Sequence, residues 1–355
     1  MKRISGWIAA VIGIALFFLL LWQGPWWFDG ARLQNDDLEP ADAMVVTGFR
    51  TMLIATGAGV IAGLGLHYTH RNHQHTLKLF DHTRDKDREQ ADLTREGQVT
   101  ERYVEAIKLL ASDNMTERLG GIYSLERIMR DSEKDHATVV AVLAAFVRQH
   151  APWTEPPPER TSPEEDVQAV LNVLGGRPER PEGFCVDLRA TDLRGADLRG
   201  GQLEGANLAG THLENADLTQ AQLRYADLSE AALRGADLTE AQLRYADLTQ
   251  ADLGNATLTE ANLGYAGLAQ ACLENAILIE AHLENAILSR ADLTGADLTQ
   301  ARLDNTILAS VDLTRNTSLT VAQLACALLH TTTALPPDLA DDPVIRARIG
   351  ERDPR

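Results

Sequence analysis

Leucine occupies every fifth position from residue 188 to residue 313, twenty-six times in succession. The residue two places before the leucine is alanine in twenty of these repeats. A period of five fits neither regular structure, because five residues advance an α-helix by about 500° and an odd step along a flat strand sends successive leucines to opposite faces. Leucine and alanine can all point inward only if the chain turns once per repeat. The period therefore predicts a solenoid of stacked turns.

The interior of this solenoid follows from the same pattern. Each buried leucine contributes roughly 1.5–3 kcal/mol, a gain that is largely offset by the conformational entropy of the ordered backbone. Alanine is small and suits the tighter positions beside the leucines. In the middle of the repeats, the residues expected in the core are Leu223, Leu228, Leu243, Leu248, Leu263, Ala221 and Ala241.

The repeats ADLRG, ADLTQ, ANLGY and ADLTG resemble the A(D/N)LXX motif of the pentapeptide-repeat family. The resemblance covers residues 184–316 and implies a right-handed quadrilateral β-helix with four repeats in each coil. About 6.5 coils at about 4.8 Å each would give a rod roughly 31 Å long. Upstream, GQVTERYVEAIKLL and RLGGIYSLERIMRDSEKDH resemble the helical region that precedes such repeats in membrane-anchored members of actinobacterial type.

Four repeats per coil would bring residues twenty positions apart onto one face. The octapeptide AQLRYADL occurs at 221–228 and again at 241–248, so the two copies are expected to stack. The aligned residues form a predicted ladder with two neighbouring cations: Tyr225, Tyr245 and Tyr265 beside Arg224 and Arg244. The ladder has two interpretations, either ring contacts that stabilise the stack or a face that binds a partner.

Apolar residues at outward positions are the other candidates for a contact surface. Ile277 falls on one face with Ile279, and Ile287 falls on the opposite face with Ile307. The remaining surface is acidic, because residues 187–315 hold twenty Asp and Glu against nine Arg, a net charge of −11. Such acidic columns also keep a repetitive β surface soluble and protect it from edge pairing.

The pattern changes after residue 313, where the next leucines fall at positions 319 and 324. We expect a C-terminal cap over 317–339, in which SLTVAQLACALL supplies a short amphipathic helix that closes the end of the core. The segment 340–355 is polar and is predicted to be a frayed tail.

Residues 97–176 have apolar side chains at helical spacing, interrupted by a Pro-rich break near 152–163. Four amphipathic helices with short turns predict a small all-α domain, either a helical bundle or an armadillo-like pair. A linker helix is expected over 71–96, ahead of this domain.

Two N-terminal stretches, about 4–22 and 51–69, have the length and composition of transmembrane helices. Tryptophans after the first stretch are typical of a membrane interface. A signal peptide is the alternative for the first stretch, but no small-x-small cleavage site follows it. Gly59 and Gly63 form a GxxxG pair in the second stretch, and we expect this small-residue face to pack the two spans together.

Charged residues around these spans predict an orientation. Lys2 and Arg3 precede the first span and four basic residues follow the second, whereas the loop between the spans is acidic. By the positive-inside rule, both termini and the repeats lie in the cytoplasm and the acidic loop is extracellular. The chain is therefore predicted to be a multi-pass protein of the plasma (inner) membrane.

Catalytic and metal-binding patterns are weak throughout. The formal charge of −18 argues against general nucleic-acid binding, and the three cysteines lack disulfide or zinc spacing. Five histidines cluster just after the second span, but no Cys or carboxylate stands at ligand spacing beside them. We predict no enzyme activity, no cofactor and no metal site. The histidines of this cluster are His67, His70, His73, His75 and His82, and the cysteines are Cys185, Cys272 and Cys326.

Three functions remain on these grounds. The leading hypothesis is a membrane-tethered, cytosol-facing scaffold that binds a cytosolic or membrane protein through its rod. The first alternative comes from the resemblance: some members of the family are acidic rods that mimic DNA and act on a type II topoisomerase. The second is an accessory subunit of a membrane transport complex, although neither span contains an embedded ion pair.

Overall fold

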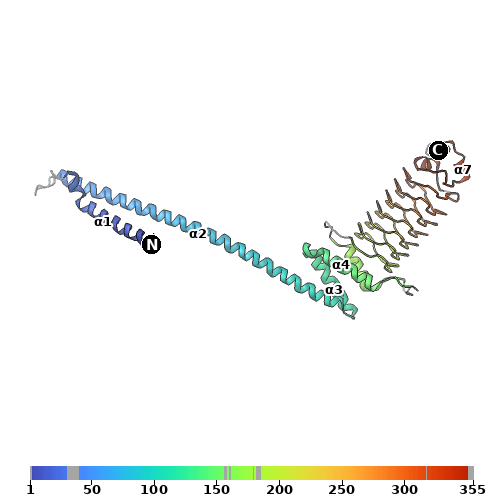
Figure 1. Cartoon of the computed structure of the whole chain (residues 1–355), viewed down its shortest axis with the longest axis horizontal. Coiled ribbons are helices and arrows are strands. Elements are labelled where there is room, and N and C mark those ends of the chain that lie inside the picture. Colours follow the sequence, from blue (N-terminus) through green and yellow to red (C-terminus); the bar gives the residue numbers. More distant parts are fainter. Residues whose placement is uncertain are drawn as a thin grey trace. The chain divides into compact units, whose positions relative to one another are not determined.

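The structure is a computed structural model that describes residues 2–29, 40–155, 158–159, 161–178, 180, 185–316 and 318–350. The chain divides into two compact units, Met1–Arg95 and Glu96–Arg355. Helices make up the first unit, and the second unit combines helices with the coiled repeats (Figure 1).

The first unit contains α1 (Lys2–Asp29) and most of α2 (Pro40–Leu110). Two glycines let aromatic rings of the other helix approach the backbone. A Cβ atom on Gly24 would lie 2.6 Å from the Phe49 ring, and one on Gly57 would lie 2.8 Å from the Phe17 ring. The two helices therefore pack on each other as expected, but the expected contact through the GxxxG pair is wrong, because no atom apart from the neighbouring backbone of α2 lies within 4 Å of where a Cβ would stand on Gly59 or Gly63.

The two predicted spans fall within these helices, and α2 continues without a break through the segment predicted as a linker. Among the described residues, α2 is the helix that is long and apolar enough to cross a membrane by length and composition. The apolar stretch of α1, Ile8–Gly24, is shorter. The middle of the predicted acidic loop, residues 30–39, lies outside the described residues.

The second unit begins with a helical bundle formed by the last turns of α2, α3 (Met115–Asp131), α4 (Glu133–His150) and α5 (Glu165–Gly175). Polar side chains start two of these helices: Asn114 accepts a hydrogen bond from the Thr116 N–H, and Ser132 accepts one from the Asp135 N–H. The bundle core holds fully buried side chains from three helices, including Ile122, Leu125, Leu143, Val147 and Val170.

The repeats form the β-helix, and its register is twenty residues. Parallel bridges join each outward residue before a leucine to the residue twenty positions later, from Asp187↔Asn207 to Ile287↔Ile307. Each side of a coil contributes one bridged residue, and no longer strand occurs among the described residues of the repeats. The β-helix is therefore built from single bridges separated by turns rather than from extended strands.

A tight turn separates every pair of sides. In the repeat around Leu223, the Ala226 N–H donates to the Leu223 carbonyl at 3.1 Å, and the intervening Tyr225 has a φ of 59°. Every fifth residue from Ala190 to Ser310 has a φ between 53° and 72°. A positive φ at the third residue of a four-residue turn is the mark of a type II turn, which favours glycine or asparagine there.

The core contains the leucines and the small residues that precede them. The seven residues expected in the core of the middle repeats are all fully buried. Threonine replaces alanine at a few inward positions, and its hydroxyl group is satisfied: Thr211 donates to the Leu188 carbonyl at 2.9 Å, and Thr306 donates to the Leu283 carbonyl at 2.7 Å. A polar group is thereby buried without an unpaired donor.

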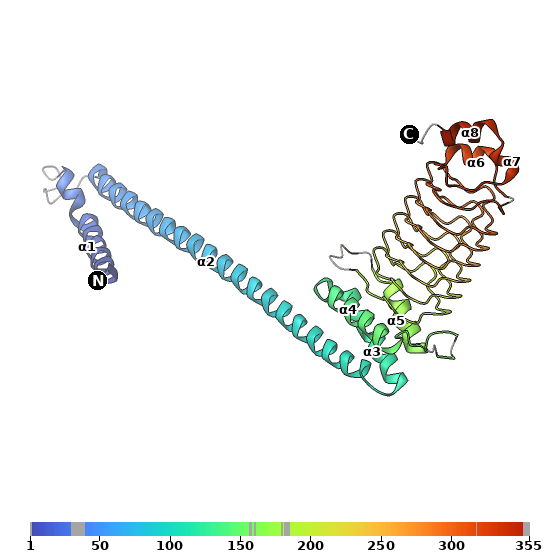
Figure 2. The same ribbon diagram turned by 45° about the vertical axis from the view of Figure 1, so that its right-hand side comes forward.

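Helices cover both ends of the β-helix, with α5 at the first coil and α6 at the last (Figure 2). The Gln202 N–H donates to the carbonyl of Gly175, where α5 ends. At the other end, α6 (Val321–Cys326) begins with a capping box formed by Thr320 and Gln323. The Gln323 side chain also donates to the carbonyls of Leu298 and Ala301 at 2.8 and 3.0 Å, so it satisfies acceptors that no further coil would reach.

The C-terminal segment is more ordered than the sequence predicts. Two short helices, α7 (Pro337–Ala340) and α8 (Pro343–Gly350), follow the cap. The predicted frayed tail is thus wrong for residues 343–350, because Ile345 is fully buried and the Arg348 Nε atom donates to the Ala325 carbonyl at 2.7 Å. Residues 351–355 lie outside the described residues.

Replacing a core leucine tests this architecture. The Leu243→Ala variant is expected to lower the free energy of opening of the middle coils by about 2–5 kcal/mol, because a cavity replaces a fully buried side chain. Native-state hydrogen exchange of peptides covering residues 221–265 measures this free energy. The matched control is Gln242→Ala at the neighbouring outward position, and an equal effect of both variants would contradict a leucine core.

Candidate interaction surface of the β-helix

The three tyrosines of the predicted ladder stack along one corner of the β-helix. The ring centroids of Tyr225 and Tyr245 are 5.0 Å apart with planes at 2°, and those of Tyr245 and Tyr265 are 4.9 Å apart with planes at 21°. The three tyrosine residues remain 53%, 39% and 46% exposed, respectively. The stacked ladder predicted from the twenty-residue register is therefore confirmed, and its outer edges are open to solvent.

Each tyrosine occupies a backbone conformation that its side chain disfavours. Their φ angles are 59°, 64° and 62°, in the left-handed region where a bulky residue is uncommon. The same column holds glycine at position 205 and asparagine at positions 285 and 305, which adopt this conformation more easily. Ring stacking of about 0.5–1.5 kcal/mol per pair offsets a strain of similar size.

Two arginines lie over the tyrosine rings. The Arg244 guanidinium carbon is 5.0 Å from the Tyr245 centroid and 5.3 Å from the Tyr265 centroid, and Arg224 lies 5.9 Å from the Tyr225 centroid. The residue one coil beyond Arg244 is Gly264, so no side chain separates Arg244 from the Tyr265 ring. The cations are thus held against the ladder by cation–π attraction.

These two arginines differ from several others on the β-helix. Arg199, Arg234 and Arg302 form ion pairs with carboxylates at 2.6, 3.2 and 2.9 Å. The hydrogen bond from Arg199 lowers the pKa of the Asp197 carboxyl group below its usual value. Within the part of the chain that the structure describes, neither Arg224 nor Arg244 forms an ion pair. Arg244 Nη2 donates a long hydrogen bond to the Tyr245 hydroxyl oxygen at 3.4 Å, and no carboxylate pairs with either guanidinium in the described residues, so an external carboxylate can reach them.

The side of the β-helix next to the ladder lacks acidic residues over its later coils. The pentapeptides 266–270, 286–290 and 306–310 stack on one another and contain no Asp or Glu, whereas each pentapeptide between them, over 271–285 and 291–305, carries a carboxylate. Bridges align Gly267, Ile287, Ile307 and Leu328 along this side, and Ile287 is 42% exposed. An acid-free, partly apolar face, whose single charged residue within these three pentapeptides is Arg290, therefore interrupts a rod with a net charge of −11.

The ladder and this face form one continuous feature. Gly267 lies two residues after Tyr265, and Ile287 is bridged to Gly267 in the next coil. Apolar side chains thus follow one another along the axis of the β-helix, exposed at the tyrosines and Ile287 and half-buried at Ile307 and Leu328. We call this feature the apolar stripe and define it by Tyr225, Tyr245, Tyr265, Ile287, Ile307 and Leu328.

The structure separates Ile277 from the other residues of the predicted interaction face. Ile277 is 38% exposed and is bridged to Thr257 and Asp297, so its neighbours along the axis are polar. Ile287 and Ile307 are bridged to each other on a different face, as predicted, but the prediction did not include the absence of carboxylates from that face. The available signal was the absence of Asp and Glu from three pentapeptides at intervals of twenty.

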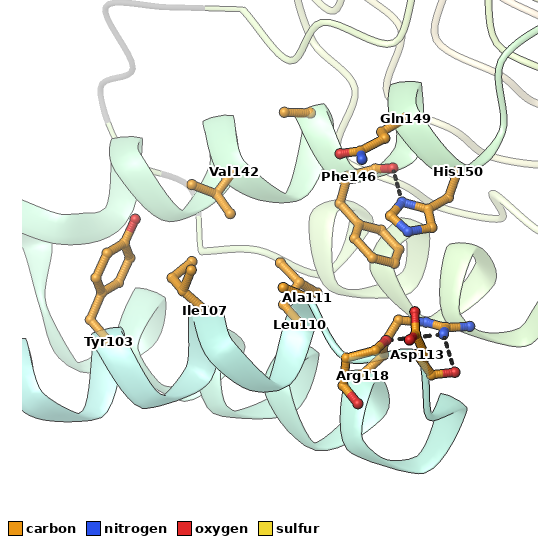
Figure 3. A pocket seen from close by; sticks show the side chains of 12 residues that line it. Tyr103, Ile107, Leu110, Ala111, Asp113, Arg118, Val142, Phe146, Gln149 and His150 are labelled. Atoms are coloured by element: carbon orange, nitrogen blue, oxygen red, sulfur yellow. Dashed lines mark hydrogen bonds between the residues drawn. The ribbon is translucent and has the colours of Figure 1, made fainter.

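A groove lies in the helical bundle, between the last turns of α2 and α4 (Figure 3). It has a volume of about 750 Å³, and its walls are mainly apolar. Tyr103 and Ile107 of α2 face Val142 and Phe146 of α4 in this view. At one end Arg118 donates to Asp166 at 2.6 Å, so its charge is satisfied within the bundle. Two polar side chains of its lining are bonded within the bundle: Ser112 donates to the Glu117 carboxylate, and the His150 Nδ1 atom contacts the Phe146 carbonyl at 2.9 Å.

The two histidines of the repeats have separate environments. His212 stacks on Trp153 with ring centroids 3.3 Å apart and contacts Glu214 at 3.1 Å, where the helical bundle meets the first coils. His282 contacts Glu284 at 3.7 Å. No group of three or more His, Cys, Asp or Glu side chains is placed to hold a metal ion in the described ranges.

Comparison with known proteins supports the fold described above. A family model for pentapeptide repeats matches eight copies over residues 202–240, 236–278 and 276–315. The chain belongs to the pentapeptide-repeat family. Domains of this family form right-handed β-helical solenoids. The comparison with curated proteins gives no match.

Three solved structures of pentapeptide-repeat proteins are similar to parts of the chain. One from the Arabidopsis thaliana thylakoid lumen is 32% identical over 29% of this chain and 71% of that one, with a TM-score of 0.28. One from the cyanobacterium Cyanothece 51142 is 27% identical over 38% and 90%, with a TM-score of 0.31. HetL, involved in heterocyst differentiation regulation in Nostoc sp. PCC 7120, is 29% identical over 42% and 78%, with a TM-score of 0.20.

The contribution of the tyrosine ladder to stability can be measured without a partner protein. The Tyr245→Asn variant is expected to lose about 1 kcal/mol of stability, because relief of left-handed strain offsets part of two lost ring contacts. Hydrogen exchange of residues 221–265 measures the change. A loss as large as that of a core leucine would show that the ladder is chiefly a structural element.

Proposed function

We propose that this pentapeptide-repeat protein is a membrane-tethered, cytosol-facing scaffold that binds another protein through its β-helix and catalyses no reaction. The observation that carries the proposal is the exposed apolar stripe beside two arginines that have no ion-pair partner in the described structure. Family members generally serve as structural or interaction proteins, which supports the same function. Contiguous exposed apolar surface flanked by polar residues is typical of protein contact sites.

The hydrogen-bonded backbone beneath the apolar stripe is well suited to binding a partner. The backbone of each inner coil is hydrogen-bonded to the coils before and after it: the Leu223 N–H donates to the Gln242 carbonyl, and the Gln242 N–H donates to the Ala221 carbonyl, both at 2.9 Å. Side chains on such a frame are already in place before a partner arrives. Binding then costs little additional ordering of the chain.

The proposed tether consists of the apolar parts of α1 and α2. Apolar side chains in both helices are exposed to the surroundings, including Ile12, Phe18, Ile61 and Leu66 at 54%, 64%, 73% and 74%. Such exposure is costly in water and favourable in hydrocarbon. The basic residues at positions 2, 3, 71 and 78 support a cytosolic location for both ends, at the plasma (inner) membrane.

The acidic surface keeps mimicry of DNA as a second candidate. A net charge of −11 over the repeats favours it. A mimic of a phosphate backbone needs closely spaced negative charge along its length. The acid-free face and the arginines at the ladder interrupt the negative charge, and for this reason we favour the scaffold.

Truncation tests the tether. The full chain is expected to remain in membranes after washing with alkaline carbonate. A chain that begins at Glu96, the start of the second compact unit, is expected to be soluble and folded. It keeps the last turns of α2 together with α3, α4 and α5, so the core of the helical bundle remains complete. Ultracentrifugation and circular dichroism provide the two readouts.

The control for this experiment is the full chain carried through the same carbonate wash and detergent extraction. Persistence of the truncated chain in the membrane pellet would contradict a tether formed by α1 and α2. Loss of its circular dichroism would contradict the independence of the second unit.

A further inference from the structure

We propose that the apolar stripe accepts an amphipathic α-helix of a partner protein, whose carboxylates pair with Arg224 and Arg244. This inference rests on the scaffold function proposed above and names the kind of partner segment that the β-helix binds. It concerns a surface that the sequence suggested only in part, because the positions of the arginines against the tyrosine rings and the stacking of the acid-free pentapeptides come from the structure.

The spacing of the stripe matches a helix better than a strand. Successive tyrosine rings are 5.0 and 4.9 Å apart. Residues three and four apart on one face of an α-helix advance by about 5.3 Å on average, since the rise is about 1.5 Å per residue. Residues two apart on an extended strand advance by about 6.6 Å. The side chains on one face of a helix therefore remain aligned with the stacked rings, whereas those of a strand are misaligned by a full ring spacing within three intervals.

The length of the stripe also suits a helix. From Tyr225 to Leu328 the stripe crosses five coil intervals, because the register is twenty residues until Ile307 and twenty-one to Leu328. At about 4.8 Å per interval this is about 24 Å. An α-helix of about 16 residues has that length, a common size for helices in globular proteins.

The apolar stripe requires the partner helix to place an apolar side chain against each of its residues. The tyrosine edges and Ile287 are 39–53% exposed, so contact with leucine-like side chains would remove substantial apolar surface from water. Gly267 lies beside Tyr265 and leaves space for a large partner side chain there, since the nearest side-chain atoms to its Cβ position, from Asp247 and Thr249, are 3.5 and 3.7 Å away.

The charges around the stripe specify where the partner carries carboxylates. Arg224 and Arg244 immediately precede their tyrosines, whereas Asp227 and Asp247 follow two residues after them and accept hydrogen bonds from the turn N–H groups of Ser229 and Thr249. A partner carboxylate is therefore attracted on the arginine side of the ladder and repelled on the aspartate side. Over the later coils the acid-free face removes this repulsion.

Site-specific photo-cross-linking in the membranes of cells that produce the full chain tests the inference. The photoreactive residue p-benzoylphenylalanine replaces Tyr245 or Ile287 on the stripe. The matched control is Ile277, which has the same position within its repeat and a similar exposure of 38% but lies on another side of the β-helix. Mass spectrometry identifies the cross-linked residues of the partner.

We expect positions 245 and 287 to label one partner, at residues separated by steps of three or four. We also expect the double variant Arg224→Glu, Arg244→Glu to reduce the yield at position 287 at least tenfold. Arg199→Glu is the charge control, because Arg199 is exposed and pairs with Asp197 away from the stripe. Hydrogen exchange over the repeats establishes that each variant is folded.

Three results would overturn the proposal: labelled residues in steps of two, labelling of a second copy of this chain, or an equal yield from position 277. To separate this failure from that of the scaffold itself, the reactive residue is also placed at 242 and 252, so that together with 277 and 287 all four sides of the β-helix carry a probe. Labelling from another side alone would leave the scaffold intact and contradict the stripe. No labelling from any side would contradict both.

Discussion

The turn that follows each leucine is the constraint on which the rest of the β-helix depends. Its third residue has a positive φ at every corner from 190 to 310, and this bend brings the next alanine and leucine back to the interior. Most of these corners carry residues other than glycine, so the turns store strain of order 1 kcal/mol each. The bridges between coils and the fully buried leucines offset that strain collectively, which makes each coil dependent on its neighbours.

A four-sided coil converts distant sequence positions into adjacent surface residues. The corner column that contains Tyr245 receives one residue from every twentieth position, as does the side that contains Ile287. Substitutions in separate repeats can therefore assemble a surface without any change to the core. The apolar stripe is such a surface, since it draws on six coils while the leucines beneath it are unchanged. In the proposed function, the membrane helices would present this surface to the cytosol.

Much of the β-helix could be predicted from the sequence because its determinants are local and periodic. The leucine period fixes what is buried, and the repeat of AQLRYADL predicts that Tyr225 stacks on Tyr245. Features that depend on a single contact were harder to predict from the sequence. The helix over Pro343–Gly350 has little apolar patterning and is held by Ile345 and Arg348. Likewise, the spacing of Gly59 and Gly63 did not reveal which face of α2 meets α1.

The candidate site was predictable only in part for a related reason. Its aromatic residues are conspicuous in the sequence, whereas its acid-free face consists of missing residue types in pentapeptides that lie far apart along the chain. Whether an arginine of the β-helix forms an ion pair depends on side-chain geometry. Arg234 reaches Asp252 in the next coil, but Arg244 lies against two tyrosine rings instead.

Cysteine cross-linking in a chain that lacks one repeat tests the twenty-residue register most directly. In a chain whose native cysteines are replaced by serine, Gln222→Cys is expected to cross-link with Gln242→Cys, its bridge partner, but not with Asp247→Cys. Deleting residues 236–240 removes one corner and one leucine, so position 222 is then expected to cross-link with the former position 247 and no longer with 242. Persistence of the 222–242 cross-link after the deletion would contradict a β-helix with four repeats in each coil.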